Sequence, residues 1–333
     1  MTHTNPASTS FEAERLNLRH RILIAEPLGF SSQALDILRS AGEVKLRDCS
    51  GSELAAAFET YDVVWIRLAH RVDRTMLPAN LRCRILATPV TGLDQIDLKA
   101  CAERGIRVIS LRGETEFLRE IRATAELTLA LALALLRHVC RAASHVLDGG
   151  WNRDEFRGRE LYGKTAGLVG VGRLGTLVAG YFRALGMEVL GYDPHANFDP
   201  QTATRVGSLP ELLGRSDAVS LHVAYTEETR HLIGGKELAE MRPGAVLINT
   251  SRGGVVDETA LLAALESGQL SGAALDVLEG EPNVTANHPL IRYAQDHDNL
   301  LIVPHIGGNT VESFEKTESF LARKVVEALR DSA

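Results

Sequence analysis

Three polar residues whose types serve acid–base chemistry stand directly after apolar runs of the chain: Arg252, Glu281 and His305. Open α/β sheets bind their ligands at the carboxyl ends of strands, where these residues are expected to lie. Arg252 can grip a carboxylate through two N–H groups, and the imidazole of His305 can transfer a proton near neutral pH. Glu281 can orient that imidazole and favour its charged form. Taken singly, Arg252 can also be a surface salt bridge and His305 a structural residue, but together the three indicate acid–base catalysis.

A glycine-rich turn indicates where the protein binds an anion. The short apolar run Thr165–Val169 is typical of a buried parallel strand, and a GxGxxG pattern follows it at Gly170, Gly172 and Gly175. The first glycine allows a tight turn, the second lets the main chain approach a phosphate, and the third lets helix and strand pack closely. The amino terminus of the next helix then attracts the anion. The turn therefore predicts a pyrophosphate site.

The residues after this turn specify the nucleotide. A helix over Arg173–Leu185 ends at Gly186, and a second apolar strand over Met187–Gly191 leads to Asp193. A carboxylate at this strand end accepts hydrogen bonds from the ribose hydroxyls of adenosine and repels a ribose phosphate. Asp193 can also simply begin the Asp-Pro turn. We expect the cofactor to be NAD rather than NADP.

Alternating apolar strands and helical stretches position these groups. The pattern begins at Arg21, resumes after Asp193, and predicts parallel α/β sheets in two lobes. A helix over Arg122–Asp148 is expected to link the lobes, and a last amphipathic helix over Val311–Leu329 is expected to return to the first lobe. The expected strands are 22–25, 44–46, 63–66, 85–87 and 108–109 in the first lobe, and 165–169, 187–191, 218–221, 245–249, 273–277 and 300–303 in the second.

Four motifs then give the chain a family resemblance. They are GLVGVGRLG at 167–175, LINTSRGGVVDE at 247–258, GAALDVLEGEP at 272–282 and PHIGGNT at 304–310. With these motifs, residues 20–330 resemble the D-isomer-specific 2-hydroxyacid dehydrogenases, particularly the phosphoglycerate dehydrogenase branch. The resemblance implies two Rossmann- or flavodoxin-like lobes with parallel sheets and an active site in the interlobe cleft. It divides the chain into a flexible N-terminal tail (1–19), a substrate-binding domain (20–112 plus 304–333) and an NAD-binding Rossmann domain (113–303).

The resemblance also implies a role for each site residue. Arg252 would bind the substrate carboxylate and carbonyl, His305 would be the acid/base, and Glu281 would support His305. A hydride would pass between the nicotinamide ring and C2 of a small anionic 2-hydroxy or 2-keto acid, while His305 exchanges the proton on the attached oxygen. Beside the three glycines and Asp193, the implied cofactor contacts are Arg173, Leu174, Thr250, Ser251, Asp276, Gly307 and Gly308.

The first lobe is expected to supply further substrate contacts. The turn formed by Val90, Thr91 and Gly92 resembles the family loop whose amides receive the substrate carboxylate. Arg67 stands where phosphoglycerate-type members have a cationic substrate contact, although it can equally be a solvated arginine.

Two stretches depart from the family pattern. The segment ISLRGETEFLREIRATA at 109–125 is longer and more charged than is usual. Its arginines either meet a second anionic group of a phosphorylated or otherwise doubly anionic substrate, or belong to a solvated loop; the candidates are Arg112, Arg119 and Arg122. The stretch HVAYTEET at 222–229 also replaces the family's usual proline-leucine-threonine pattern. This departure affects which residues line the nicotinamide pocket.

Composition disfavours other classes of protein. The 333 residues are 45% hydrophobic and carry a net charge of −7 without a basic block, which suits two globular domains and disfavours nucleic acid and anionic membranes as partners. The four cysteines are scattered without a CxxC pair, so we expect a reducing cytoplasm and no metal site. Residues 1–20 lack the apolar core of a signal peptide, and the most apolar stretch, Ala123–Leu136, is too short to cross a bilayer.

Two alternative functions and one assembly state complete the expectations. The chain can be an NAD(H)-sensing binding protein of the corepressor type, which the intact acid–base set disfavours. It can also be a formate- or phosphite-type dehydrogenase on the same fold; Glu281 disfavours formate, whereas phosphite stays open. The apolar helix 122–148 predicts a homodimer, which the family commonly forms.

Overall fold

The computed structural model describes residues 20–331, which form an α/β protein with two compact units. Residues 20–118 and 310–331 make up the N-terminal unit, and residues 119–309 make up the C-terminal unit. The predicted domain boundaries, at 112/113 and 303/304, lie a few residues before these divisions. The predicted tail, 1–19, lies outside the described residues.

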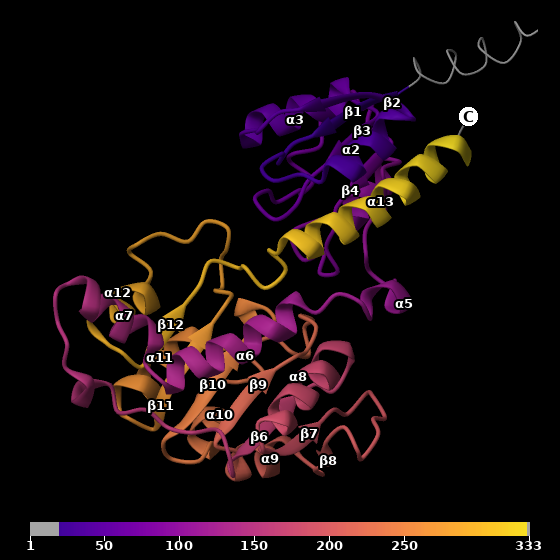
Figure 1. The fold of residues 1–333 in the computed structure, drawn as a ribbon. Coiled ribbons are helices and arrows are strands. Elements are labelled where there is room, and N and C mark those ends of the chain that lie inside the picture. The colour runs from indigo at the N-terminus through magenta and orange to yellow at the C-terminus, as the bar shows by residue number, and fades with distance from the viewer. Residues whose placement is uncertain (1–19, 332–333) are drawn as a thin grey trace, which may run out of the picture. The chain divides into compact units, whose positions relative to one another are not determined.

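The N-terminal unit is built on a five-stranded parallel sheet with the order β2-β1-β3-β4-β5. Strands β3 and β4 and the last three residues of β1 are buried, as expected when helices cover both faces of a parallel sheet. Helix α13 packs along α2, so the C-terminal helix belongs to this unit (Figure 1). The strands are β1 (His20–Ile24), β2 (Gly42–Leu46), β3 (Val63–Trp65), β4 (Ile85–Ala87) and β5 (Arg107–Ile109); the helices are α2 (Ser32–Arg39), α3 (Gly51–Thr60), α4 (Leu98–Glu103), α5 (Thr115–Leu118) and α13 (Val311–Asp331).

The C-terminal unit contains a seven-stranded parallel sheet with the order β12-β11-β10-β9-β6-β7-β8. Its two faces carry separate apolar cores, one beneath α9 to α12 and one beneath α6 and α8. The strands are β6 (Thr165–Val169), β7 (Glu188–Tyr192), β8 (Thr204–Arg205), β9 (Ala218–Leu221), β10 (Ala245–Asn249), β11 (Leu270–Leu275) and β12 (Leu300–Ile302). The helices are α6 (Ala123–Leu136), α7 (Val139–Leu147), α8 (Arg173–Ala184), α9 (Leu209–Arg215), α10 (Gly235–Glu240), α11 (Glu258–Glu266) and α12 (Pro289–Asp296), with short 3-10 turns at Arg153–Phe156 and Gly253–Val255.

The predicted single helix over Arg122–Asp148 is wrong, because the structure breaks it into α6 and α7. His138 adopts the left-handed conformation, with φ 53°, and the two helical stretches meet at an angle of 63°. Helix α6 is apolar nearly all round and is buried against the sheet and α8, whereas α7 has no buried residue. Alanine and leucine continue across the break, so composition alone does not reveal it.

No single helix within residues 20–331 is long and apolar enough to span a membrane. The stretch Thr115–Leu136 reaches that length and composition only when it is joined to the bent α7.

Candidate active site

The glycine-rich turn follows β6, at the point where the strand order of the C-terminal sheet reverses. Strands β7 and β8 lie on one side of β6, and β9 lies on the other. Gly170 has a φ of 90°, and a Cβ on it would lie 2.6 Å from the carbonyl oxygen of His222. A Cβ on Gly175 would lie 2.3 Å from the oxygen of Gly170. Gly172, in contrast, faces open space at the amino terminus of α8, where no side chain caps the helix. This turn, open at Gly172 and placed at a helix amino terminus, fits a pyrophosphate.

Asp193 follows β7 and lies beside the glycine-rich turn. Its Oδ2 accepts the amide of Val171 at 2.9 Å, and its Oδ1 accepts the amides of His195 and Ala196, each at 2.9 Å. Burial alone would raise the pKa of Asp193, but the three backbone amides outweigh it and lower the pKa below its usual value. The carboxylate is therefore charged and fixed, as recognition of ribose hydroxyls requires.

Arg173 opens α8, but its side chain is engaged within the unit. Its Nη1 donates to the carbonyl oxygen of Ile121 at 2.8 Å, and burial lowers the pKa of the guanidinium. The predicted contacts of Arg173 and Leu174 with a pyrophosphate stay predictions.

Arg252 lies on a turn that the end of β10 holds in place. Asn249 donates through its side-chain amide to the carbonyl oxygen of Arg252 at 2.9 Å and accepts the amide and hydroxyl of Ser251 at 3.0 and 2.7 Å. The turn also packs tightly on the loop after β11, since a Cβ on Gly253 would lie 2.0 Å from the carbonyl carbon of Leu278. The turn that carries Arg252 therefore rests on the loop that carries Glu281.

Glu281 and His305 form a direct pair. The Nδ1 atom of His305 lies 2.9 Å from Oε1 of Glu281, and both side chains are half-buried. His305 has a φ of 52°, which few non-glycine residues adopt, and its backbone N–H donates to the carbonyl oxygen of Asp276 at 2.8 Å. This backbone conformation aims the imidazole at Glu281.

Asp276 anchors the turn that carries His305. Its carboxylate accepts the amide of Ile306 at 2.6 Å and the amide of Gly307 at 2.9 Å. A Cβ on Gly307 would lie 2.7 Å from Oδ2 of Asp276, so only glycine fits there without a shift. Burial raises the pKa of Asp276 to about 6, although the two amides and nearby His305 act in the opposite direction. Gly308, one residue further along, faces open space.

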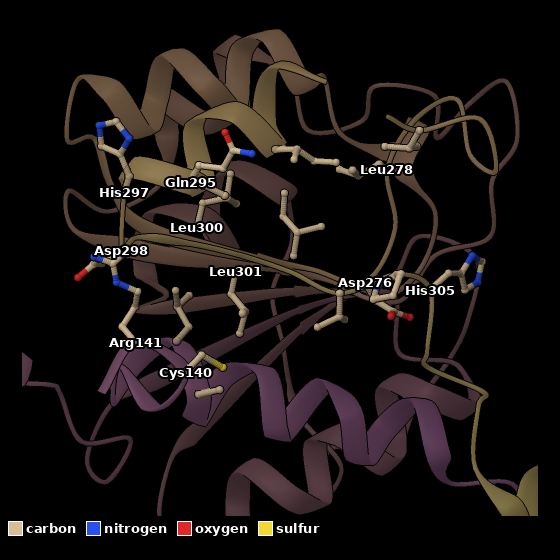
Figure 2. A pocket seen from close by; sticks show the side chains of 18 of the residues that line it. Cys140, Arg141, Asp276, Leu278, Gln295, His297, Asp298, Leu300, Leu301 and His305 are labelled. Carbon is tan, nitrogen blue, oxygen red and sulfur yellow. The ribbon is translucent and has the colours of Figure 1, made fainter. Parts of the chain in front are cut away.

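A cavity of about 660 Å³ opens beside this pair in the C-terminal unit (Figure 2). Asp276 and His305 lie at one end of it, and Cys140, Arg141 and Asp298 lie at the other. Its walls are mostly apolar, with leucines from β12 and the loop after β11. The imidazole thus stands at the edge of a sheltered space, which favours ligand binding.

Sequence reasoning missed two groups that support the site. The buried hydroxyl of Thr128, on α6, lies 2.8 Å from that of Thr250. Glu258 accepts the amide of Glu279 at 2.8 Å and pairs with His288 at 3.1 Å, so it holds the loop that leads to Glu281. Burial raises the pKa of Glu258. Glu258 is the last residue of the motif at 247–258, so the motif could have pointed to it. Thr128 lies in an apolar helix, and nothing in the sequence around it indicates a role in the site.

The predicted substrate contacts of the N-terminal unit follow two neighbouring strands of its sheet. Val90, Thr91 and Gly92 come after β4, where Leu111 donates to the oxygen of Val90 at 3.1 Å. Arg67 comes after β3, and its guanidinium contacts Glu318. The arginines of the charged segment are exposed, and Glu114 within it pairs with Lys324 of α13. Their roles toward a substrate stay predictions.

Several known proteins are similar to this chain. The family model described as D-isomer specific 2-hydroxyacid dehydrogenase, NAD binding domain, matches residues 129–307. Hydroxypyruvate reductase of Thermotoga maritima is 34% identical over 311 residues, which cover 93% of this chain and 99% of that protein. D-3-phosphoglycerate dehydrogenase of Methanocaldococcus jannaschii is 34% identical over 316 residues, and the chain spans 57% of the length of that relative. The crystal structure of D-lactate dehydrogenase from Aquifex aeolicus, complexed with NAD and lactic acid, is 31% identical with a TM-score of 0.80, covering 94% of this chain and 96% of that chain.

Proposed function

Because the chain belongs to the D-isomer-specific 2-hydroxyacid dehydrogenase family, we propose that it is an NAD-dependent enzyme that interconverts D-2-hydroxy acids and 2-keto acids. The observation that carries this proposal is the pair of His305 and Glu281, 2.9 Å apart at the edge of a cavity. A proton donor held by a carboxylate is what reduction of a carbonyl group needs. The open turn at Gly172 supports NAD as the cofactor.

Each residue of the site has a defined task in this proposal. Glu281 accepts the hydrogen bond from Nδ1 of His305, so Nε2 is the nitrogen that gives a proton to the carbonyl oxygen of a keto acid and removes it in the reverse direction. Arg252 binds the substrate carboxylate and stabilises the charge that develops on the carbonyl oxygen. Asp276 keeps the turn of His305 in position. Bound NAD supplies or accepts the hydride through its nicotinamide ring.

Oxidation of NADH with a panel of 2-keto acids tests this function, with the handedness of the product determined by chiral chromatography. We expect D-2-hydroxy acids to form in a one-to-one ratio with the NADH consumed. NADH binding without turnover of any keto acid would instead favour the sensor alternative. Reduction of NAD by phosphite but not by 2-hydroxy acids would favour the phosphite-type alternative.

We also infer that the protein is a homodimer, as expected for this family. Helix α7 and the loop after it present large apolar side chains to solvent, including Leu147 (87% exposed) and Trp151 (89% exposed). A second copy of the chain would remove these side chains from water. Light scattering of the wild type should give twice the chain mass, and replacing both residues with serine should give the single mass. A monomeric wild type at micromolar concentration would exclude the dimer.

A reducing compartment such as the cytoplasm suits the cysteines. All four are free thiols, and burial raises the pKa of Cys83 to about 12 and that of Cys101 to about 11. Buried thiols of this kind do not readily form thiolates and so are poor candidates for disulfide exchange.

A further inference from the structure

The N-terminal sheet has its own expected ligand position. Its order, β2-β1-β3-β4-β5, reverses between β1 and β3, and open α/β sheets bind ligands outside the carboxyl ends of the strands at such a point. Glu26 lies just beyond the end of β1, and Arg67 lies just beyond the end of β3. The topology therefore places Arg67 where a ligand is expected, independently of any family resemblance.

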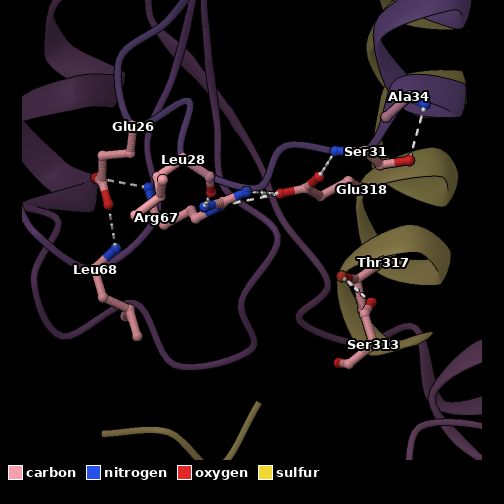
Figure 3. Close-up of polar contacts among 9 residues, drawn as sticks. All are labelled: Glu26, Leu28, Ser31, Ala34, Arg67, Leu68, Ser313, Thr317 and Glu318. Atoms are coloured by element: carbon pink, nitrogen blue, oxygen red, sulfur yellow. Dashed lines mark hydrogen bonds and ion pairs between the residues drawn. The ribbon is translucent and has the colours of Figure 1, made fainter. Parts of the chain in front are cut away.

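The guanidinium of Arg67 is already occupied by groups of its own unit (Figure 3). Its Nε and Nη2 both donate to Oε1 of Glu318, at 3.0 and 2.5 Å, and its Nη1 donates to the carbonyl oxygen of Leu28 at 2.7 Å. Its planar group also lies 4.3 Å from the ring centroid of Phe314. Three directed hydrogen bonds and a ring contact hold the side chain in one place.

Burial and a backbone hydrogen bond hold Glu318, the partner of Arg67, in place. Its side chain is fully buried (0% exposed), whereas that of Arg67 is 13% exposed. Its second oxygen accepts the amide of Ser31 at 2.7 Å, at the start of α2. Burial raises the pKa of Glu318, and the Ser31 amide and Arg67 offset this only in part, so the arginine favours the charged form of the carboxylate. Removing either partner would leave a buried charge uncompensated.

The balance of charge at this point is unfavourable to a second anion. Glu26 accepts the amides of Arg67, Leu68 and Ala69 at 2.8, 3.2 and 3.2 Å, so its carboxylate is held on the main chain beside Arg67, while the guanidinium itself pairs with Glu318 (Figure 3). A phosphate group that approached Arg67 would meet a guanidinium already neutralised by Glu318 and would be repelled by the Glu318 carboxylate. A substrate tail that carries no charge meets no such penalty.

We propose that Glu318 is a specificity-determining residue, which neutralises Arg67 and restricts the enzyme to 2-hydroxy and 2-keto acids without a phosphate on their tail. This inference rests on the proposed dehydrogenase function and names its substrate class. It replaces the expectation that Arg67 is a cationic substrate contact. Glu318 excludes the phosphate, and the arginine serves to hold Glu318.

The test compares hydroxypyruvate with its phosphate ester, 3-phosphohydroxypyruvate, as substrates for NADH oxidation. The wild type should have the higher kcat/KM for hydroxypyruvate. Glu318→Gln keeps the size of the side chain and removes its charge, so Arg67 regains an unpaired positive charge. We expect the ratio of kcat/KM for the phosphate ester to that for hydroxypyruvate to rise about tenfold or more, which corresponds to about 1.4 kcal/mol and is in the range of one hydrogen bond to a charged group.

A matched control comes from another ion pair of the same helix. Glu114 pairs with Lys324 of α13, and both side chains are about a third exposed. Glu114→Gln should leave the substrate ratio as in the wild type. Adding Arg67→Met to Glu318→Gln should cancel the gain. The inference is wrong if the wild type prefers the phosphate ester, or if folded Glu318→Gln keeps the wild-type ratio.

Inorganic phosphate gives a second readout that needs neither turnover nor a fully stable variant. Phosphate should raise the Tm of Glu318→Gln more than that of the wild type, and adding Arg67→Met should abolish the difference. Equal shifts in all three proteins would overturn the role of Glu318. If neither keto acid is reduced by the wild type, the proposed function fails, while the phosphate titration still decides the inference about Glu318.

Discussion

The buried carboxyl of Asp276 should make the stability of this protein depend on pH in a direction opposite to that of most aspartates. Burial raises its pKa from 3.8 to about 6, so the folded protein holds a proton that the unfolded chain releases. The stabilisation is complete below the unfolded pKa and is lost as pH rises through the folded one. With these two values, linkage gives a loss of about 2 kcal/mol between pH 4.5 and pH 8. Asp276→Asn has no such proton to lose.

Urea unfolding of both proteins at intervals from pH 4.5 to pH 8 measures this effect. Asp276→Asn should be the less stable protein at pH 4.5, because the hydroxyl oxygen of the protonated carboxyl can still accept an N–H, whereas an amide turns its NH2 toward Ile306 or Gly307. The difference should shrink by about 2 kcal/mol by pH 8. The exposed Asp296 offers a control, and Asp296→Asn should follow the wild type throughout. Parallel curves for the wild type and Asp276→Asn would refute the reasoning.

Three further predictions concern the rest of the site. Glu281→Gln should lower kcat by about one to three powers of ten, because an amide does not stabilise a charged imidazole, and steady-state assays with unchanged NADH binding check this. Gly170→Ala should cost about 1 to 3 kcal/mol of stability and weaken NADH binding, because its φ of 90° and the carbonyl oxygen of His222 leave no room for a Cβ. NADH fluorescence titrations measure the affinity, with Gly180→Ala, in open space on α8, as the control. Equal NADH affinities of the Gly170→Ala and Gly180→Ala proteins would contradict the expectation. Partial burial lowers the pKa of His222 to about 4, so its contribution to stability is present above pH 6.5 and is lost as pH falls. The wild type should lose about 2 kcal/mol more than His222→Asn between pH 8 and pH 5 in urea unfolding, and an equal loss would argue against a neutral imidazole in the folded protein.

Much of the fold could be predicted because buried parallel strands are short apolar runs between helices. The expected bounds of four strands agree with the structure, and those of the other predicted strands differ by only a few residues; the four are β4 (Ile85–Ala87), β6 (Thr165–Val169), β9 (Ala218–Leu221) and β10 (Ala245–Asn249). The two-residue strand β8 was missed, since Thr204 and Arg205 are exposed and show no apolar pattern. The break at His138 was missed because a left-handed residue leaves no mark in composition.

The chemistry of the site was easier to predict than its environment. Motif order named Glu281 and His305, and the structure brings them within 2.9 Å. The partner of Arg67 was not predictable, because Glu318 lies 251 positions further along the chain on a helix that reads as an ordinary amphipathic one. Whether an arginine is neutralised depends on which carboxylate the fold brings to it, and the spacing of residues along the sequence does not reveal such a long-range partner.

The direct test of the account is the rate of NADH oxidation by His305→Ala, measured with NADH binding in the same samples. The account predicts that kcat with a 2-keto acid falls by about two to four powers of ten while NADH binds as in the wild type. Near-normal turnover by a folded His305→Ala protein would contradict the claim that His305, held by Glu281, is the acid/base of this enzyme.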